Sequence, residues 1–160
     1  MDAAGGVEEA NDVDVKELGH LVLYVRDVEA SRHFYRDLLG WEEIVGVEHR
    51  MAMFSSGRTH HELLLLEVGA DATPIPEGRR VGMYHFGLKI GTTDQELKDA
   101  MRELVDAGAD VRGTADHGVT HSLYIADPDG NEIELYIDVQ PEVWREDPHA
   151  VMAPARPLRI

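Results

Sequence analysis

The chain has 160 residues, enough for one domain or two small, closely joined ones with a buried core. Its net charge of −16 at pH 7 argues against nucleic acid or an anionic membrane surface as a partner. The absence of cysteine excludes disulfides and thiolate metal sites, whereas nine histidines remain as possible metal ligands. No apolar run approaches the roughly 18 residues that a membrane span requires.

The two ends of the chain differ in composition from the middle. Residues 1–16 are acidic and rich in Gly and Ala, and they lack the basic and apolar regions of a signal peptide. We therefore expect a flexible N-terminal tail and a cytoplasmic protein. Residues 140–160 contain Trp144, Pro148, Pro154 and Pro157. They predict an irregular C-terminal tail that packs on the surface or against a second subunit.

The first half of the remaining chain predicts one strand, one helix and three strands. Residues 18–25 are typical of a buried strand. A helix follows, capped by Asp27 or Ser31 and ended by Gly40. Its apolar side consists of Phe34, Tyr35, Leu38 and Leu39. The next strands are predicted at 41–47, 50–54 and 61–68.

The second half repeats this order. Residues 69–81 carry Pro74, Pro76 and Gly78 and are typical of a linker. A strand at 84–90 precedes a helix at about 95–107, which Thr92, Thr93 or Asp94 caps and Gly108 ends. Three short strands are predicted at 110–114, 120–126 and 132–139.

The chain thus contains the order βαβββ twice, in modules 17–68 and 82–139 of a single domain, 17–139. His20 and His85, 65 residues apart, occupy equivalent places in the first strand of each module. Aligning residues 66–68 with 137–139 puts Leu63 opposite Glu134. We predict an α+β fold in which two paired βαβββ modules form a curved sheet around a metal-binding cavity.

Three residues of this repeat form a candidate metal site. His20, His85 and Glu134 lie on three strands that the repeat directs toward one cavity. Two imidazoles and one carboxylate form the facial arrangement that suits non-haem Fe(II) and leaves positions open for substrate and oxygen. Taken singly, each residue is more simply a core histidine or a solvated strand residue. Their equivalent placement in the repeat favours the metal site.

Other histidines and one tyrosine are candidates for proton transfer and substrate contact. In the overlay, His61 shares a face with Leu63 and points into the cavity, whereas Glu62 points away. His61 could then move a proton near the metal, unless it is half of a surface pair with His60. Tyr124 precedes Glu134 by ten residues across the turn Asp127-Pro128-Asp129-Gly130, which makes the two possible cross-strand neighbours. Two further histidines lie just before this tyrosine, at His117 and His121.

Several stretches resemble the vicinal oxygen chelate superfamily, which includes glyoxalase I, extradiol dioxygenases, fosfomycin-resistance proteins and bleomycin-binding proteins. The similarity covers about residues 17–139. It is carried by 19–41, His60-His61-Glu62-Leu63, Tyr84-His85-Phe86, Asp116-His117-Gly118-Val119, Tyr124 and 127–136. These motifs are most similar to those of single-module extradiol dioxygenases of the catechol 2,3-dioxygenase type.

The resemblance implies a function and a role for each site residue. His20, His85 and Glu134 would hold Fe(II), or Mn(II) as in some relatives. His61 would be the base that deprotonates a catechol-type aromatic diol, with O2 as second substrate. The substrate oxygens would contact His117 and Tyr124, with His60 and His121 as weaker candidates. The stretch from His117 to Tyr124 is about two residues shorter than in two-module relatives, so His121 could replace His117. A homodimer is also implied.

Two alternatives use the same fold. A glyoxalase-type lyase or isomerase would use Ni(II) or Zn(II) and a fourth ligand, a carboxylate in the first module, where the overlay has Leu63. A metal-free protein that sequesters a drug would lack the three ligands that this chain contains. A fosfomycin-modifying transferase would need a basic pocket, which an acidic chain does not predict.

Overall fold

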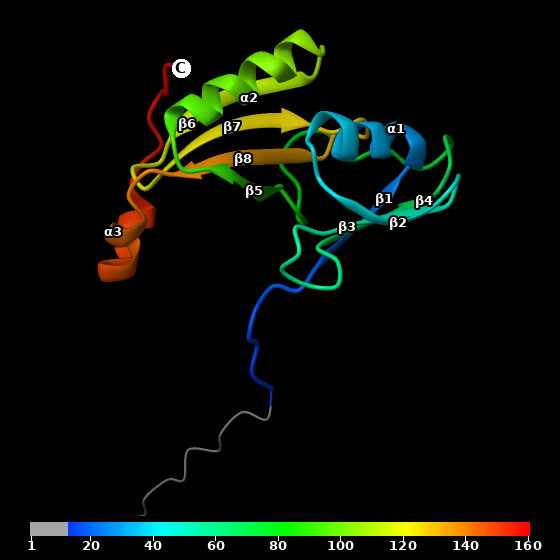
Figure 1. Ribbon diagram of the computed structural model, residues 1–160, viewed down its shortest axis with the longest axis horizontal. Helices are drawn as coiled ribbons and strands as arrows, with labels where there is room; N and C mark the ends of the chain where they lie inside the picture. Colours follow the sequence, from blue (N-terminus) through cyan, green and yellow to red (C-terminus); the bar gives the residue numbers. More distant parts are fainter. Residues whose placement is uncertain (1–12) are drawn as a thin grey trace, which may run out of the picture.

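The computed structural model describes residues 13–160 and contains two four-stranded sheets (Figure 1). The strand orders are β1-β4-β3-β2 and β5-β8-β7-β6. In each sheet the first strand of the module runs parallel to the last, and the other neighbours are antiparallel. This confirms the predicted α+β fold. Most of the predicted N-terminal tail lies outside the described residues.

The elements of both modules follow the predicted order. The first sheet consists of β1 (Leu21–Val25), β2 (Glu43–Val47), β3 (Met51–Phe54) and β4 (Leu63–Glu67). The second sheet consists of β5 (His85–Gly91), β6 (Asp110–Asp116), β7 (Thr120–Ala126) and β8 (Glu132–Asp138). The helices are α1 (Val28–Arg32), which continues into the π-helical segment η1 (His33–Leu38), and α2 (Asp94–Asp106). Among residues 13–160, no helix is both long and apolar enough to cross a membrane.

Both helices begin at side-chain caps that the sequence predicted. Asp27 accepts hydrogen bonds from the backbone N–H groups of Glu29 and Ala30. Thr93 and Glu96 form a reciprocal capping box at the start of α2. Gly40, which follows the first helix, has φ of +68°, a conformation that disfavours residues with a Cβ.

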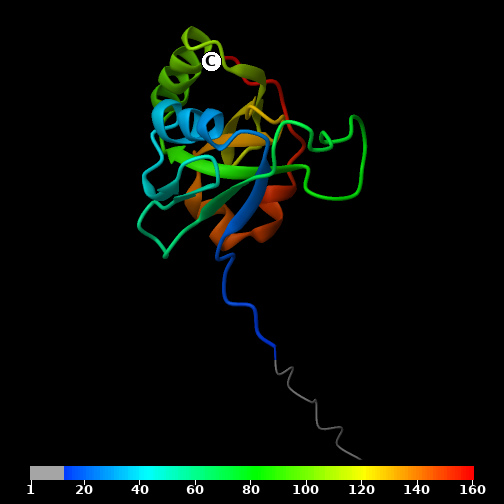
Figure 2. The same cartoon turned by 90° about the vertical axis from the view of Figure 1, so that its right-hand side faces the viewer.

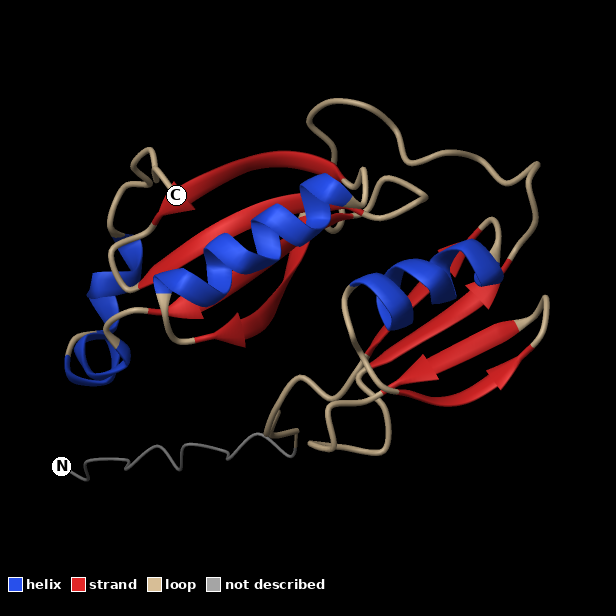
Figure 3. Ribbon diagram, turned by 45° about the horizontal axis from the view of Figure 1, so that its top comes forward, coloured by secondary structure: helices blue, strands red, loops and turns tan. Residues whose placement is uncertain are grey.

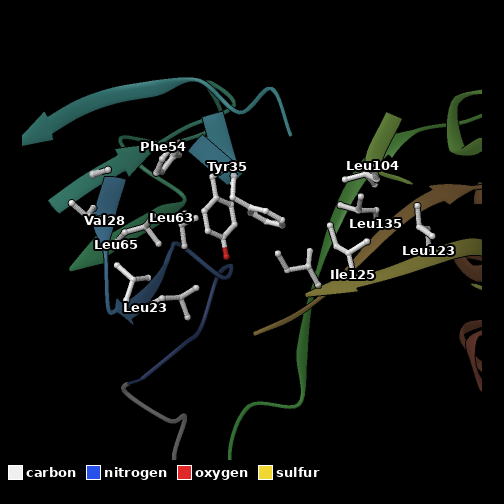
Figure 4. Close-up of a cluster of buried hydrophobic side chains, with 14 of the residues drawn as sticks. Leu23, Val28, Tyr35, Phe54, Leu63, Leu65, Leu104, Leu123, Ile125 and Leu135 are labelled. Carbon is white, nitrogen blue, oxygen red and sulfur yellow. The ribbon is translucent and has the colours of Figure 1, made fainter. Parts of the chain in front are cut away.

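The hydrophobic core lies between the sheets and the helices α1 and α2. These two helices cover the same side of the molecule (Figure 3). One part of the core surrounds Tyr35, and the other lies between α2 and the second sheet (Figure 4). Alternate residues of β8 join it, since Ile133, Leu135 and Ile137 are buried. The other face of each sheet is directed away from the helices.

Hydrogen bonds connect the two modules at the turn between β7 and β8. Tyr35 donates its hydroxyl to the buried carboxylate of Asp127 at 2.8 Å. Asp129 accepts from the backbone N–H of Arg26 and from its guanidinium, each at 3.1 Å. The Asp-Pro-Asp-Gly turn therefore fixes the second module to the first.

The pairing of β1 with β4 corrects the predicted overlay by one residue. Leu64 lies opposite Val22, as Glu134 lies opposite Gly87 in the second module. Leu63 and Leu65 are fully buried, so they occupy the core face. The alignment of Leu63 with Glu134 was therefore wrong, and so was the face assigned to Glu62. A one-residue shift exchanges the two faces of a strand.

The segment after β8 is more ordered than predicted. It contains the short helix α3 (Pro141–Glu146) and a 3₁₀-helix (Pro148–Met152), and then returns along the edge of β6. Arg156 and Asp116 exchange two backbone hydrogen bonds, and Thr114 donates to the carbonyl of Leu158. The expectation of an irregular tail was wrong over 141–152. By contrast, the connection at 69–84 contains no helix or strand, and Figure 2 shows it as a long loop at the side of the molecule.

We expect Arg156→Pro to lower the free energy of unfolding by about 1 kcal/mol or more, because proline cannot donate the 2.8 Å bond to Asp116 O. Arg156→Ala keeps that N–H group and should stay within about 0.5 kcal/mol of wild type. Urea unfolding followed by circular dichroism measures both. Equal stability of the two variants would show that the strand bridge contributes nothing.

Candidate metal centre

The outer face of the second sheet gathers polar side chains. Glu132, Glu134 and Tyr136 alternate along β8 with the buried residues, so they point away from α2. On β7, Ser122 and Tyr124 lie opposite Tyr136 and Glu134. This confirms that Tyr124 and Glu134 are cross-strand neighbours.

His85 and Glu134 form the centre of this face. His85 Nε2 lies 3.3 Å from Glu134 Oε2. Two ligand atoms on one metal ion, at bonds of about 2.1 Å, lie about 3.0 to 3.4 Å apart. On its other side, His85 Nδ1 is buried and has no hydrogen-bond partner among residues 13–160, and Glu132 Oε1 lies 3.5 Å from it. The pair therefore has the donor atoms and the spacing for one divalent cation.

The other carboxylate oxygen of Glu134 accepts hydrogen bonds from neighbouring side chains. Ser122 Oγ donates to Glu134 Oε1 at 2.6 Å, and Tyr124 Oη does so at 3.2 Å. His117 Nε2 lies 2.8 Å from the same tyrosine hydroxyl. Burial and the Glu134 carboxylate raise the pKa of Tyr124 to about 12. The phenol thus remains a hydrogen-bond donor at neutral pH.

A second cluster belongs to the first module. The rings of His20 and His61 have centroids 4.5 Å apart, and His60 Nδ1 lies 2.6 Å from His61 Nδ1. Burial, and then the charges of His20 and His60, lower the pKa of His61. The imidazole is therefore neutral at pH 7, as a base must be. His61 lies beside the predicted ligand His20, although the face argument for it was wrong.

The two clusters are not joined into one ligand group. His20 is exposed, and its recorded ring contacts are with His60 and His61. Within residues 13–160, no three side chains of His, Asp or Glu are close enough together to hold a metal ion. The donor pair of the second module fits a divalent cation, and the role of His20 as third ligand stays a prediction.

One predicted residue lies away from the site, and one residue of the site was not predicted. His121 lies opposite Ile137 on the core face of β7, and its Nδ1 contacts the carboxylate of Asp94 at 2.6 Å. It therefore does not replace His117 beside Glu134. Sequence analysis missed Ser122, although strand parity with Tyr124 could have placed it on the outer face.

A cavity of about 840 Å³ lies where α2 and the second sheet meet the first module, and none of the candidate metal-site residues lines it. Gly87 and Tyr136 line it from the second sheet, and Trp41 and Glu62 line it from the first module. A Cβ at Gly87 would lie 3.8 Å from Glu134 Oε2 and 3.3 Å from the Tyr136 ring. Glycine thus leaves space beside the carboxylate.

The sequence profile of the Glyoxalase/Bleomycin resistance protein/Dioxygenase superfamily matches residues 17–135. The chain belongs to this superfamily. It is 32% identical over 130 residues to catechol-2,3-dioxygenase of Bacillus subtilis (strain 168), an alignment that covers 81% of the chain and 44% of that relative. The chain thus spans less than half of the relative's length.

Solved structures agree with the superfamily assignment. A glyoxalase/dioxygenase from Nostoc punctiforme superposes with a TM-score of 0.68 at 23% identity, covering 82% of this chain and 99% of that one. Lactoylglutathione lyase from Agrobacterium tumefaciens superposes with a TM-score of 0.59 at 27% identity, covering 81% and 97%. Proteins similar to this chain therefore include both a dioxygenase and a lyase.

Proposed function

We propose that this protein is a metal-dependent extradiol dioxygenase that cleaves the ring of a catechol-type diol with O2. The observation that carries the proposal is the placement of His85 Nε2 and Glu134 Oε2 3.3 Å apart, beside the hydrogen-bonded pair Tyr124 and His117. The similarity to the catechol-2,3-dioxygenase supports it. Fe(II) is the proposed metal and Mn(II) the alternative, with His20 completing the ligand set.

The side chains of the site have separate tasks in this proposal. Bound Fe(II) would supply Lewis acidity that lowers the pKa of the diol hydroxyls, and a position for O2. His61, neutral at pH 7, accepts a proton from a diol hydroxyl. Tyr124, which stays protonated, turns its hydroxyl hydrogen from Glu134 Oε1 to a substrate oxygen when the diol binds. His117 contacts the tyrosine hydroxyl and can pass a proton to it.

The first module argues against a glyoxalase-type lyase. The resemblance associates the lyase with a fourth ligand, a carboxylate in the first module, and strand pairing puts Leu64 at the place that matches Glu134. Glu62 precedes β4, and its carboxylate accepts hydrogen bonds from Ser56 and Arg58. Burial raises the pKa of Glu62, but these hydrogen bonds outweigh it and lower the pKa. This carboxylate is thus committed to a local ion pair.

Oxygen uptake tests the proposed function. The protein is loaded anaerobically with Fe(II) and mixed with a panel of catechols in an oxygen-electrode cell. We expect rapid uptake together with a yellow ring-opened product. Bound Fe(II) without uptake would reject the dioxygenase, and a trial of Ni(II) or Zn(II) with a thiol hemiacetal would then test the lyase. The absence of bound metal and of uptake would favour a metal-free binding protein.

We expect His61→Ala to keep its metal and to lower kcat/KM by roughly 10²-fold or more, in the range for loss of a general base. Metal content by elemental analysis and steady-state oxygen uptake measure the two quantities. The exposed His33, whose Nδ1 contacts Asp37, provides the matched control, and His33→Ala should retain wild-type rates. Wild-type turnover of His61→Ala on every catechol would refute the base assignment.

A further inference from the structure

The structure of β7 alone does not explain why a polar serine is buried at position 122. Ser122 is fully buried on β7, on the same face as Tyr124 and opposite Tyr136 of β8. Burying a hydroxyl is unfavourable unless it forms a hydrogen bond. Its Oγ forms one, at 2.6 Å to Glu134 Oε1. The hydroxyl is therefore committed to the carboxylate of the candidate metal centre.

The two carboxylate oxygens of Glu134 have different neighbours. Ser122 and Tyr124 both donate to Oε1, at 2.6 and 3.2 Å. Oε2 faces His85 Nε2 at 3.3 Å. Hydrogen bonds to one oxygen fix the torsion of a carboxylate and direct the other oxygen. The arrangement thus presents a single oxygen, Oε2, on the side of the histidine.

We propose that Ser122 is a positioning residue that makes Glu134 a ligand through Oε2 alone. The inference rests on the proposed function, because it requires that Glu134 bind a metal. Ser122 acts through the carboxylate and touches neither metal nor substrate. Tyr124 cannot replace it, because its bond to Oε1 is longer and its hydroxyl also contacts His117. Loss of the serine hydroxyl leaves the carboxylate held at Oε1 only by the longer hydrogen bond from Tyr124.

Binding of Mn(II) to the full-length, metal-free protein tests this role without any turnover. The electron paramagnetic resonance signal of free Mn(II) gives the dissociation constant. We expect Ser122→Ala to weaken binding by about 10- to 100-fold, the usual effect of losing a residue that orients a ligand. Ser122→Thr retains the hydroxyl and should bind within about threefold of wild type.

Ser31 provides the matched control, since it is also fully buried but its Oγ has no hydrogen-bond partner in the described part of the chain. Ser31→Ala should leave Mn(II) affinity unchanged. Wild-type affinity in Ser122→Ala, or a failure of Ser122→Thr to restore binding, would overturn the positioning role. Absence of Mn(II) and Fe(II) binding by the wild-type protein would instead overturn the proposed function, so the two failures are distinguishable.

Discussion

Glu134→Ala is expected to abolish the retention of a divalent metal. The variant removes Oε2, the oxygen that lies 3.3 Å from His85 Nε2, and leaves the imidazole of His85 without this carboxylate at the candidate site. Divalent cations bound by histidine need further donors to complete their coordination. We expect less than about one tenth of the wild-type metal content after gel filtration, and no oxygen uptake with any catechol.

Asp138 provides a matched control for this variant. It lies on the same strand and face, four residues further, and its carboxylate pairs with Lys89. Asp138→Ala should retain the metal and the activity. Wild-type metal content in Glu134→Ala would show that the second sheet does not hold the cation, and the proposed function would lose the observation on which it depends.

Asp127→Ala is expected to destabilise the fold by about 3 kcal/mol or more. The carboxylate is buried and accepts hydrogen bonds from Tyr35, from the backbone of Asp129, and from the backbone and side chain of Asn131. Each buried donor left without an acceptor costs about 1 to 3 kcal/mol. For a chain of this size the melting temperature should fall by about 6 to 12 °C in a calorimetric scan.

Two further variants bracket this effect. Tyr35→Phe removes one donor and should cost about 1 kcal/mol. Asp110→Ala removes an exposed carboxylate that pairs with Arg112, and it should change stability by less than about 0.5 kcal/mol. An Asp127→Ala variant as stable as Asp110→Ala would show that the turn does not fix the modules to each other.

The Asp127 carboxylate also predicts that the free energy of unfolding depends on pH. Burial raises the pKa of Asp127, and the hydrogen bonds from Asn131 and Tyr35 offset this only in part. Because the folded value exceeds the unfolded one, the stabilisation is complete below the unfolded pKa of about 3.9 and is lost as pH rises through the folded pKa. The difference in free energy of unfolding between wild type and Asp127→Ala should therefore decrease as pH rises above about 4. An increase would contradict the assignment.

Local sequence patterns were sufficient for the secondary structure. The Asp27 and Thr93 caps, Gly40 and the alternation in 132–138 predicted the elements that the structure contains. Each of these signals acts within one turn or one strand, so the chain around it determines the outcome. The C-terminal segment was different, because its bridge at Arg156 depends on Asp116 at the edge of β6, which is remote in sequence.

The candidate site shows where the sequence was not enough. Alternation along β8 placed Glu134 on the outer face, and the ten-residue spacing placed Tyr124 beside it. The run of leucines from 63 to 66 has no alternation that could fix its register, so its partner strand decided which leucine matches Glu134. Strand parity alone could have excluded His121 from the outer face. The pairing of β7 with β8 places it on the core face, opposite Ile137.

By itself, the sequence determined the repeated βαβββ order and the superfamily, and it predicted candidate metal ligands, because periodicity and residue chemistry are local properties. Only the tertiary structure decided the contacts among them. The bond of Ser122 to one oxygen of Glu134, the contact of His61 with His20, and the anchoring of Tyr35 to Asp127 all join residues from different elements. Such contacts depend on module packing and on strand register. A one-residue shift in register would turn each side chain of a strand to the opposite face.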